Sequence, residues 1–555
     1  MQLPVDFQAA FEEARQHQAA GRFLDAERIF RHLAESKDHR HFPLEALADL
    51  FFLQQRFDEC LDILKELTQI DPDSVHYAAK LSNLLSSLGK TDAAIDEYLR
   101  LLRRQPDDAI AHFNVALLYK KQRRYTEALS AYQEAARTGL EQLQDAYSEM
   151  GTVHSEMLNA DEAREMFERA LEIAPDHIPA LFNLAGLCEE SGEKDRAIEL
   201  YEKILSIEPD HWKALARLAY PRKVTVDDQN LVERLKTCID RTKDDRSAQE
   251  VLYFALGKAY DDLESYDEAA ASFVAANQIS RQRVLPYSPD QTERAFDRLI
   301  DVFDSNWIKD RATDSEFAPI FICGMYRSGS TLLERMLAGH PAIAAGGELQ
   351  TLAWLVARIV GPFPNEAARA SKEQLQQIAD EYEKEVRSLV LDFPFTTDKR
   401  PDNFLRVGLI KAIFPRATVI QTRRNISDNS LSIYFQQFSR AANYANDLRH
   451  IAHYYQQQER LFAHWRECCP ENICTVEYES LVEQPEAVLR RILEFLGLEW
   501  DSGVLNFQKS PGLVRTYSVW QVREGLYHRS KDRWRNYKPL LGDLELGPHA
   551  DSTGG

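Results

Sequence analysis

A glycine-containing stretch at residues 324–331 has the residue types and the spacing of an anion-binding loop. It reads GMYRSGST and follows the apolar run PIFIC. The stretch fits the phosphate-loop pattern G-x-x-x-x-G-K-[ST] except at the seventh position, where Ser330 replaces lysine, while Arg327 supplies a cation earlier. In nucleoside triphosphatases that lysine reaches the β- and γ-phosphates, and the next hydroxyl holds magnesium. The sequence therefore predicts a cradle for a smaller phosphate or sulfate group without a metal, and it disfavours a divergent kinase.

Backbone freedom explains how this loop can hold an anion. Gly324 and Gly329 permit backbone angles that other residues resist, so that successive N–H groups can point inward. A helix that begins near Ser330 adds the favourable field of its N-terminus. Both effects favour a phosphate or sulfate group at the start of that helix.

The segments around the loop alternate between short apolar strands and helices. Strand then helix occurs four times, which predicts a mainly parallel sheet covered on both faces. Ligands of such sheets bind at the carboxyl ends of the strands, where the glycine loop falls. The four pairs are PIFICG with TLLERMLAGH, KRPDN with FLRVGLIKAIF, ATVIQT with SDNSLSIYFQQF, and NICTVEY with PEAVLRRILEFLG.

The first half of the chain is a repeat. A small residue recurs every 34 or 35 positions, and a large apolar or aromatic residue follows four positions later. This pattern resembles the tetratricopeptide repeat over roughly residues 6–283, which implies paired helices stacked into a superhelix with a concave protein-binding face. The repeated pairs are Ala26 with Phe30, Cys60 with Leu64, Ala94 with Tyr98, Ala128 with Tyr132, Ala163 with Phe167, and Ala197 with Tyr201.

One repeat departs from the pattern. The unit at residues 212–246 carries Pro221 inside its expected first helix, followed by TVDD. Because proline removes a helix hydrogen bond, a break or bend of the solenoid is predicted there. The repeats either present a partner protein or only support or dimerise the second half, since function follows from sites and not from folds.

These patterns predict a multidomain chain. Its 555 residues exceed what one hydrophobic core can organise. The predicted fold is an all-α tetratricopeptide solenoid followed by an α/β P-loop-like domain with a mainly parallel sheet. The expected boundaries are 1–285 for the solenoid, 286–317 for a connecting helical segment, 318–541 for the α/β domain, and 542–555 for a disordered tail.

Charge and composition exclude several classes of function. A net charge of -21 argues against a nucleic-acid binder, which needs a basic surface. The N-terminus shows no secretory pattern, and the apolar stretch 352–364, interrupted by Arg358, is too short to insert in a membrane. The seven cysteines lack metal-ligand spacing and fit reduced thiols. A cytoplasmic protein is therefore expected.

The loop and a second element together resemble a known enzyme family. YRSGSTLL resembles the 5′-phosphosulfate loop of sulfotransferases, which use 3′-phosphoadenosine 5′-phosphosulfate, and Arg424 with Ser432 matches the family's arginine and serine spaced by eight residues. The resemblance covers about residues 318–541. With the repeats, it points to bacterial tetratricopeptide sulfotransferases and, more distantly, to tyrosylprotein sulfotransferases. It implies a metal-free enzyme with that donor, which leaves as adenosine 3′,5′-bisphosphate.

The resemblance also implies the donor ligands. Arg327 should hold the 5′-phosphosulfate together with backbone N–H groups and hydroxyls of the loop, and Arg424 with Ser432 should bind the 3′-phosphate. The loop residues concerned are Ser328, Gly329, Ser330 and Thr331.

Two further residues match catalytic positions of the family. Glu348 in AAGGELQT falls where tyrosylprotein sulfotransferases carry their catalytic glutamate, with a helix-start carboxylate as the alternative. Lys399 in DKRP matches the lysine beside the bridging oxygen, where it stabilises charge on the leaving phosphate. The alternative is a solvated lysine beside a turn, and Arg400 competes for the same role.

The C-terminal stretch TYSVWQVREGLYHRSKDRWRNY is the one strongly basic stretch of an acidic chain. It favours a clamp on the donor phosphates, with Ser518 near the adenosine and with Arg523 and Lys531 on the anion. The alternative is a solvated basic face that pairs with the acidic repeats.

Three positions depart from the family pattern. Tyr326 replaces a proline before Arg327, Asn425 with Ile426 replaces Asp-Pro, and Asp532 stands where a glycine often precedes Arg-Trp. The leading hypothesis is a sulfotransferase whose repeats present a protein or peptide acceptor, with tyrosine as one acceptor. The alternatives are a carbohydrate or small-molecule sulfotransferase and an inactive repeat scaffold, and a homodimer is compatible with each.

Overall fold

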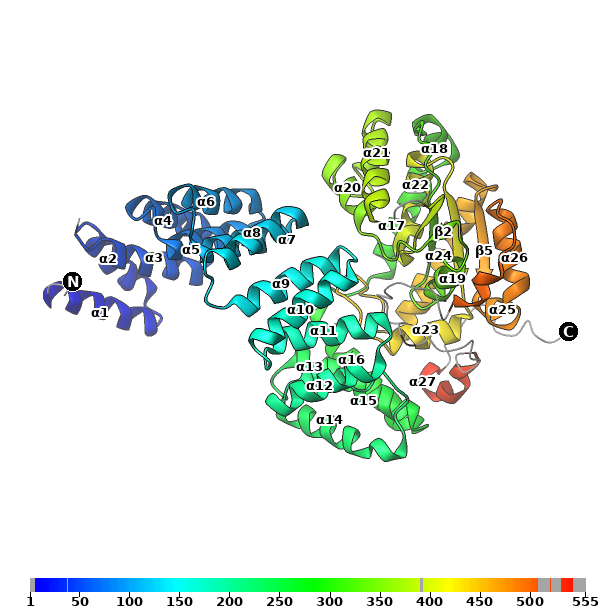
Figure 1. Ribbon diagram of the computed structural model, residues 1–555, viewed down its shortest axis with the longest axis horizontal. Coiled ribbons are helices and arrows are strands. Elements are labelled where there is room, and N and C mark those ends of the chain that lie inside the picture. Colours follow the sequence, from blue (N-terminus) through cyan, green and yellow to red (C-terminus); the bar gives the residue numbers. More distant parts are fainter. Residues whose placement is uncertain (1–4, 37, 390–392, 508–519, 521–530, 543–555) are drawn as a thin grey trace. The chain divides into compact units, whose positions relative to one another are not determined.

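A computed structural model describes residues 5–36, 38–389, 393–507, 520 and 531–542 of the chain (Figure 1). The chain divides into two compact units, Met1–Asn183 and Leu184–Gly555. The predicted tail beyond Gly542, Ser518 and Arg523 lie outside the described residues. Over the described part of the chain, no helix is both long and apolar enough to cross a membrane.

The first unit consists of antiparallel helix pairs. The small residues of the repeat are buried, and so are the aromatic residues that follow them, which confirms the predicted packing. At Gly151 a methyl group would meet the Phe167 ring at 2.6 Å, so the helices touch where a small residue allows it. Its helices are α1 (Val5–Ala19), α2 (Phe23–Ala34), α3 (His41–Leu53), α4 (Phe57–Ile70), α5 (Val75–Ser87), α6 (Thr91–Arg104), α7 (Ala109–Lys121), α8 (Tyr125–Arg137), α9 (Leu143–Glu156) and α10 (Ala160–Ile173).

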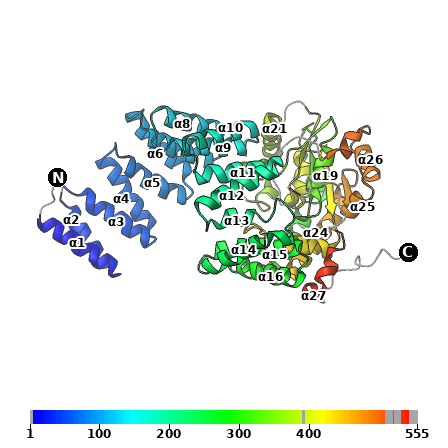
Figure 2. The same ribbon diagram turned by 60° about the horizontal axis from the view of Figure 1, so that its bottom comes forward.

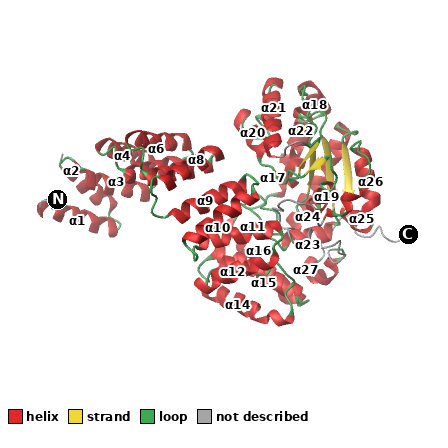
Figure 3. Cartoon of the chain, in the orientation of Figure 1, coloured by secondary structure: helices red, strands yellow, loops and turns green. Residues whose placement is uncertain are grey.

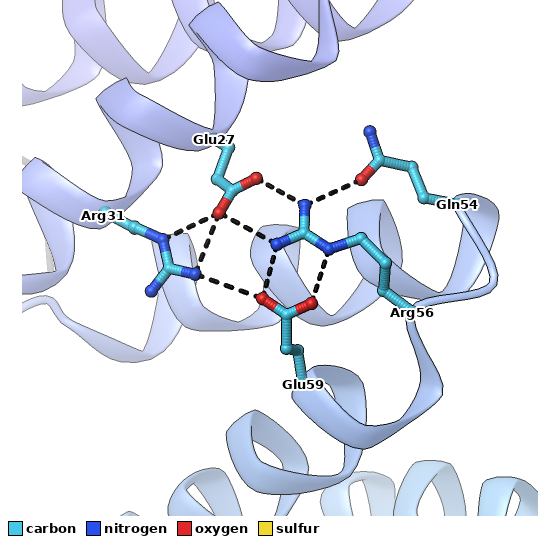
Figure 4. A network of polar contacts seen from close by, with 5 residues as sticks. All are labelled: Glu27, Arg31, Gln54, Arg56 and Glu59. Carbon is cyan, nitrogen blue, oxygen red and sulfur yellow. Dashed lines mark hydrogen bonds and ion pairs between the residues drawn. The ribbon is translucent and has the colours of Figure 1, made fainter.

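A polar network joins the first two repeats (Figure 4). Arg56, which precedes α4, donates to Glu27 on α2 at 2.6 Å and to Glu59 on its own helix at 2.6 Å. Arg31 pairs with both carboxylates. The hydrogen bond from Arg56 is the largest cause that lowers the pKa of Glu27. Because its oxygens are all paired, the network fixes the register of α2 against α4.

The repeats continue into the second unit. Its helical part contains α11 (Ile178–Ser191), which straddles the division, α12 (Lys194–Ile207), α13 (Trp212–Arg217), a 3₁₀ turn (Val226–Asp228), α14 (Gln229–Arg241), α15 (Arg246–Asp262) and α16 (Tyr266–Arg283). Helix α13 has only 6 residues and ends before Pro221, as expected of a proline inside a helix; the bend of the solenoid stays a prediction.

The sheet of the second unit, whose strands are yellow in Figure 3, has five parallel strands. Their order is β2-β3-β1-β4-β5. The strands are β1 (Ile320–Gly324), β2 (Ile343–Ala344), β3 (Phe395–Asp398), β4 (Thr418–Arg423) and β5 (Ile473–Glu477). Three predicted strands are confirmed. The assignment of KRPDN as a strand was wrong, because Pro401 begins a 3₁₀ turn and the strand is the preceding FTTD. The two-residue β2 was not expected.

Helices cover both faces of this sheet, as predicted. Phe321 and Cys323 of β1 face one core with α17, α18, α20, α21, α22 and α24, whereas Ile320 and Ile322 face another with α19 and α26. The helices are α17 (Pro289–Val302), α18 (Ser305–Arg311), α19 (Ser330–Leu337), α20 (Thr351–Ile359), α21 (Lys372–Leu389), α22 (Val407–Ile413), α23 (Ile426–Tyr434), α24 (Leu448–Cys468), α25 (Tyr478–Glu483), α26 (Pro485–Phe495) and α27 (Lys538–Leu541).

The last repeat packs into the α/β domain. The Phe273 ring of α16 stacks on Phe435, directly after α23, with centroids 4.0 Å apart. Asn277 donates to the Tyr434 carbonyl at 2.8 Å. In both Figure 1 and Figure 2, α15 and α16 lie beside α27, and Tyr266 contacts Tyr537 just before it. The expected boundary at residue 285 therefore cuts through a shared core, and the compact unit begins much earlier.

Candidate active site

Four of the five strands end next to predicted site residues. The glycine loop follows β1, Glu348 follows β2 after three residues, Lys399 follows β3 directly and Arg424 follows β4 directly. Because the strands are parallel, their carboxyl ends lie at one edge of the sheet. The fold thus gathers at this edge residues that are far apart in the sequence.

Sterics require both glycines of the loop. Gly324 has φ 156°, and a methyl group there would meet the Thr422 carbonyl oxygen of β4 at 2.3 Å. Gly329 has φ 95°, and its methyl group would meet the Tyr478 ring at 2.5 Å. Arg327 also has a positive φ, 65°, which costs a non-glycine residue about 1–3 kcal/mol. Its side chain reaches Ser432 of α23, to which Nε donates at 3.1 Å.

Ser328 points into the protein. Its hydroxyl bonds to the Met325 carbonyl at 2.7 Å and to the Thr422 hydroxyl at 2.6 Å, and its N–H donates to the same carbonyl at 3.3 Å. This N–H therefore has an acceptor within the loop, and its contact with an anion stays a prediction. Ser330 and Thr331 begin α19, whose first-turn N–H groups have no acceptor within the helix. With Gly329, they form the positive end of that helix.

Arg327 contacts both Ser432 and Arg424, which the spacing of eight residues did not predict. The Arg424 guanidinium donates to the Arg327 carbonyl at 3.2 Å and lies over the Tyr478 ring, 4.8 Å from its centroid. Arg424 and Ser432 are both buried. Asn425, the departure next to Arg424, caps α23 by accepting from two backbone N–H groups. This departure therefore supports the helix that carries Ser432.

Asp428 of α23 holds the C-terminal segment. Its carboxylate accepts from the backbone N–H groups of Asp532 at 2.8 Å and of Trp534 at 2.9 Å. Burial raises the pKa of Asp428. Asp532 has φ 58°, a left-handed conformation that explains why a glycine suits this position, and aspartate tolerates it better than most residues.

The basic C-terminal stretch is largely paired where it is described. Lys531 is 42% exposed and forms an ion pair with Glu483 of α25. The ion pair described for Lys531 is thus with a carboxylate. No described contact joins Lys531 to Arg327 or Arg424, the predicted anion-binding arginines. Arg533 pairs with Asp261 of α15, as the alternative of a basic face against acidic repeats predicted.

Glu348 and Lys399 form an ion pair. The Lys399 ammonium, only 1% exposed, donates to Glu348 Oε1 at 2.7 Å, and the Glu348 side chain is 36% exposed. Neither alternative holds, because α20 begins at Thr351 and Lys399 is buried. Arg400 instead pairs with Asp402 at 2.6 Å. The solvent-accessible carboxylate can accept the proton of an acceptor group, and the buried ammonium can stabilise a leaving anion.

Sequence reasoning missed two buried carboxyl groups. Glu334 on α19 accepts from the Thr397 hydroxyl at 2.6 Å and from the Gly347 N–H at 3.0 Å, and burial raises its pKa. Asp398 accepts from the Tyr382 hydroxyl at 2.8 Å, and burial raises its pKa to about 7. A glutamate within the apolar run TLLERML was the available signal for the first of them.

Comparison with known proteins decides the family of this domain. Residues 319–502 match the model described as "Sulfotransferase family", and residues 80–140, 142–208 and 251–283 match tetratricopeptide repeat models. The chain carries a sulfotransferase-family domain behind tetratricopeptide repeats.

Several proteins are similar to this chain over part of its length. An uncharacterized protein of Aquifex aeolicus (strain VF5) is 35% identical over 306 residues, 52% of this chain and 40% of that protein. Protein-tyrosine sulfotransferase A of Caenorhabditis elegans is 28% identical over 207 residues, 35% of this chain and 53% of its own length. Protein-tyrosine sulfotransferase of Drosophila melanogaster is 25% identical, over 42% of this chain and 46% of its own length. The chain thus spans about half the length of the curated relatives it matches.

A solved structure is also similar. The sulfotransferase domain of the Synechococcus PCC 7002 olefin synthase shares 24% identity over 40% of this chain and 89% of that chain, with a TM-score of 0.31. A score this low adds no weight to the family match.

The cations of the sulfotransferase domain are spread over one edge of the sheet. Arg327 lies in the loop after β1, Lys399 at the end of β3, and Arg424 at the end of β4. The strands β3 and β4 flank β1 on either side. The residues present thus fit an anionic ligand that contacts the first turn of α19 and also α23, where the Arg327 side chain meets Ser432.

Proposed function

We propose that the chain is a sulfotransferase that moves a sulfuryl group from 3′-phosphoadenosine 5′-phosphosulfate to an acceptor hydroxyl. The observation that carries the proposal is the Glu348–Lys399 pair at the same sheet edge as a phosphate loop without lysine. The bound donor supplies an activated S–O bond to phosphate. Arg327 and the first turn of α19 bind the 5′-phosphosulfate, while Arg424 and Ser432 bind the 3′-phosphate.

Glu348 and Lys399 then act on two different oxygens, the acceptor oxygen and the bridging oxygen of the donor. A bond forms between the acceptor oxygen and sulfur, and the bond between sulfur and the bridging phosphate oxygen breaks. Glu348 accepts the proton of the acceptor hydroxyl, since its side chain is accessible. Lys399 stabilises the charge that develops on the leaving phosphate. Before the donor binds, the Lys399 ammonium donates a hydrogen bond to Glu348. When the donor is bound, the same ammonium interacts with both Glu348 and the phosphate.

We propose a protein or peptide acceptor. Two observations support this: curated relatives are protein-tyrosine sulfotransferases, and the repeats occupy the first half of the chain. Transfer of radiolabelled sulfate to a tyrosine-containing peptide tests this proposal, with a phenylalanine peptide as the matched control. Transfer to sugars or small phenols alone would replace the protein acceptor with the alternative substrate class.

Calorimetric titration with adenosine 3′,5′-bisphosphate tests the donor site. We expect binding in the micromolar range, weakened about tenfold to a hundredfold in Arg327→Ala and in Arg424→Ala, because each removes a charge-assisted hydrogen bond. Arg416→Ala is the matched control, since this exposed arginine pairs with Glu316. No binding by the wild type would contradict the proposal and favour the inactive repeat scaffold.

A further inference from the structure

The backbone that carries Glu348 is held at two successive peptide groups. The Gly346 N–H donates to the Thr397 hydroxyl at 3.1 Å, and the Gly347 N–H donates to Glu334 Oε1 at 3.0 Å. The Gly347 carbonyl accepts from the Lys399 N–H at 2.8 Å. A methyl group at Gly346 would meet the Thr397 carbonyl oxygen at 2.2 Å. The glycine thus allows the segment to lie directly against β3.

The Thr397 hydroxyl connects the Gly346 N–H to the Glu334 carboxylate. A hydroxyl has one proton to donate, and Thr397 Oγ1 lies 2.6 Å from Glu334 Oε1. Oγ1 accepts from Gly346, and its proton goes to Glu334, because the other acceptor in reach, the Ala344 carbonyl, is farther away at 3.4 Å. A single carboxylate oxygen of Glu334 therefore accepts both the Thr397 hydroxyl and the Gly347 N–H. Bonds to an ionised acceptor are stronger than bonds between neutral groups.

Glu334 lies on the helix that begins the donor loop. It is 4% exposed and follows Ser330, the first residue of α19, by four residues. An apolar side chain would pack at such a position at lower cost, because burial of a carboxylate is unfavourable unless its hydrogen bonds are made. The nearby Lys399 charge offsets part of that cost by lowering the pKa that burial raises. Packing alone therefore does not account for a glutamate at this position.

We infer that Glu334 and Thr397 are positioning residues that fix Glu348 relative to the first turn of α19. The inference rests on the proposed function, in which Glu348 takes the acceptor proton. Misplacement of a reacting group by 1 Å costs about a hundredfold in rate. A tether from the donor helix to the base-carrying segment keeps the base and the sulfur at a constant separation, although neither Glu334 nor Thr397 touches substrate.

Hydrogen exchange tests the tether without reference to activity. In Glu334→Ala and Thr397→Val, hydrogen exchange of peptides covering residues 343–349 should accelerate about tenfold or more. Glu334→Ala removes the acceptor of the Gly347 N–H, and Thr397→Val removes the acceptor of the Gly346 N–H. Glu334→Gln keeps an acceptor oxygen and should stay within about threefold of the wild type. Exchange over β1 reports the fold, and Glu97→Ala, which removes a buried glutamate of the first unit, is the matched control.

Turnover tests the consequence of the tether. In Glu334→Ala and Thr397→Val, kcat should fall about a hundredfold while the KM for the donor stays constant, and Glu334→Gln should restore most of kcat. If Glu334→Ala loosens β1 as well, Thr397→Val decides alone, since it removes one hydroxyl and keeps the shape. Unchanged exchange over residues 343–349, or an unchanged kcat with faster exchange, overturns the inference. A wild type without turnover contradicts the proposed function, and the exchange rates still decide whether the tether exists.

Discussion

Lys399→Met should remove most of the turnover and leave the fold intact. Methionine has a similar length and no charge, so it fills the buried position and removes only the ammonium. The ammonium is 1% exposed and contacts Glu348, whose carboxylate is accessible enough to stay hydrated when its partner is lost. The variant therefore separates the chemical role of Lys399 from its role in packing.

The expected magnitude follows from the geometry. A unit charge about 4 Å from the leaving phosphate is worth about 4 kcal/mol at an effective dielectric constant near 20. Loss of one preorganised donor in comparable sites lowers kcat by about 10²–10³. We expect a fall in kcat within that range. Removal of one partner of a fully buried ion pair costs about 3–5 kcal/mol, but the exposed Glu348 can become hydrated when Lys399 is lost. Because the Lys399 charge also offsets the burial of Glu334, we expect the unfolding free energy to fall, by less than about 3 kcal/mol.

Lys411→Met is the matched control. This lysine is also buried, and burial lowers its pKa to about 8, but it donates to the carbonyl oxygens of Pro415 and Ala417. Its replacement leaves the buried Ala417 carbonyl and the partly buried Pro415 carbonyl without their donor, and an unsatisfied buried acceptor costs about 1–3 kcal/mol. The variant should therefore lose stability and keep its kcat.

Urea unfolding and sulfate transfer to the tyrosine peptide, measured on both variants, check this pair of expectations. A Lys399→Met protein that retains more than a tenth of the wild-type kcat would show that the ammonium does not stabilise the leaving phosphate. Loss of kcat in Lys411→Met without loss of stability would show that the assay responds to any buried lysine.

Three further predictions concern the loop, a buried acid and the domain boundary. Gly329→Ala should weaken bisphosphate binding by calorimetry, because its φ of 95° and the adjacent ring exclude a methyl group; unchanged affinity would remove the steric argument. Burial raises the Asp398 pKa to about 7, so the folded chain binds more protons than the unfolded chain between about pH 4 and 7. Relative to Asp398→Asn, wild-type unfolding free energy should therefore fall as the pH rises across that window in urea titrations, and parallel curves would contradict the pKa shift. A chain that begins at residue 176 should bind the bisphosphate with the affinity of the full chain. A chain that begins at residue 286 lacks Phe273 and exposes Phe435, so it should bind more weakly. Equal affinities of the two chains would refute the shared core.

The sequence predicted those parts of the site that local spacing determines. The loop glycines, the start of α19 at Ser330 and the placing of Ser432 on the helix that follows Arg424 depend on residues a few positions apart. Repeat packing was predictable for the same reason, because a buried small residue and a buried aromatic one turn later belong to one helix.

The remaining features depend on contacts between distant segments. Glu334 stands within the apolar run TLLERML, but only the structure shows that its carboxylate contacts Thr397, 63 residues away. The strand before Lys399 was predicted at KRPDN, but it ends at Asp398. The burial of Lys399 at the end of this strand could therefore not be anticipated. The boundary at residue 285 followed the end of the repeat pattern, but Phe273 packs on α23 across it.

The distribution of cations explains why the loop dispenses with its lysine. A lysine at the start of the helix concentrates charge on contiguous phosphates. In this chain that position is Ser330, buried in the first turn of α19, and the cations come from three elements: the loop itself, the end of β3 and the end of β4. As β3 and β4 flank β1, the charges lie on both sides of the loop instead of along it. Such an arrangement suits a ligand whose two anionic ends are separated by a nucleoside, and it leaves the helix N-terminus to bind a single phosphosulfate.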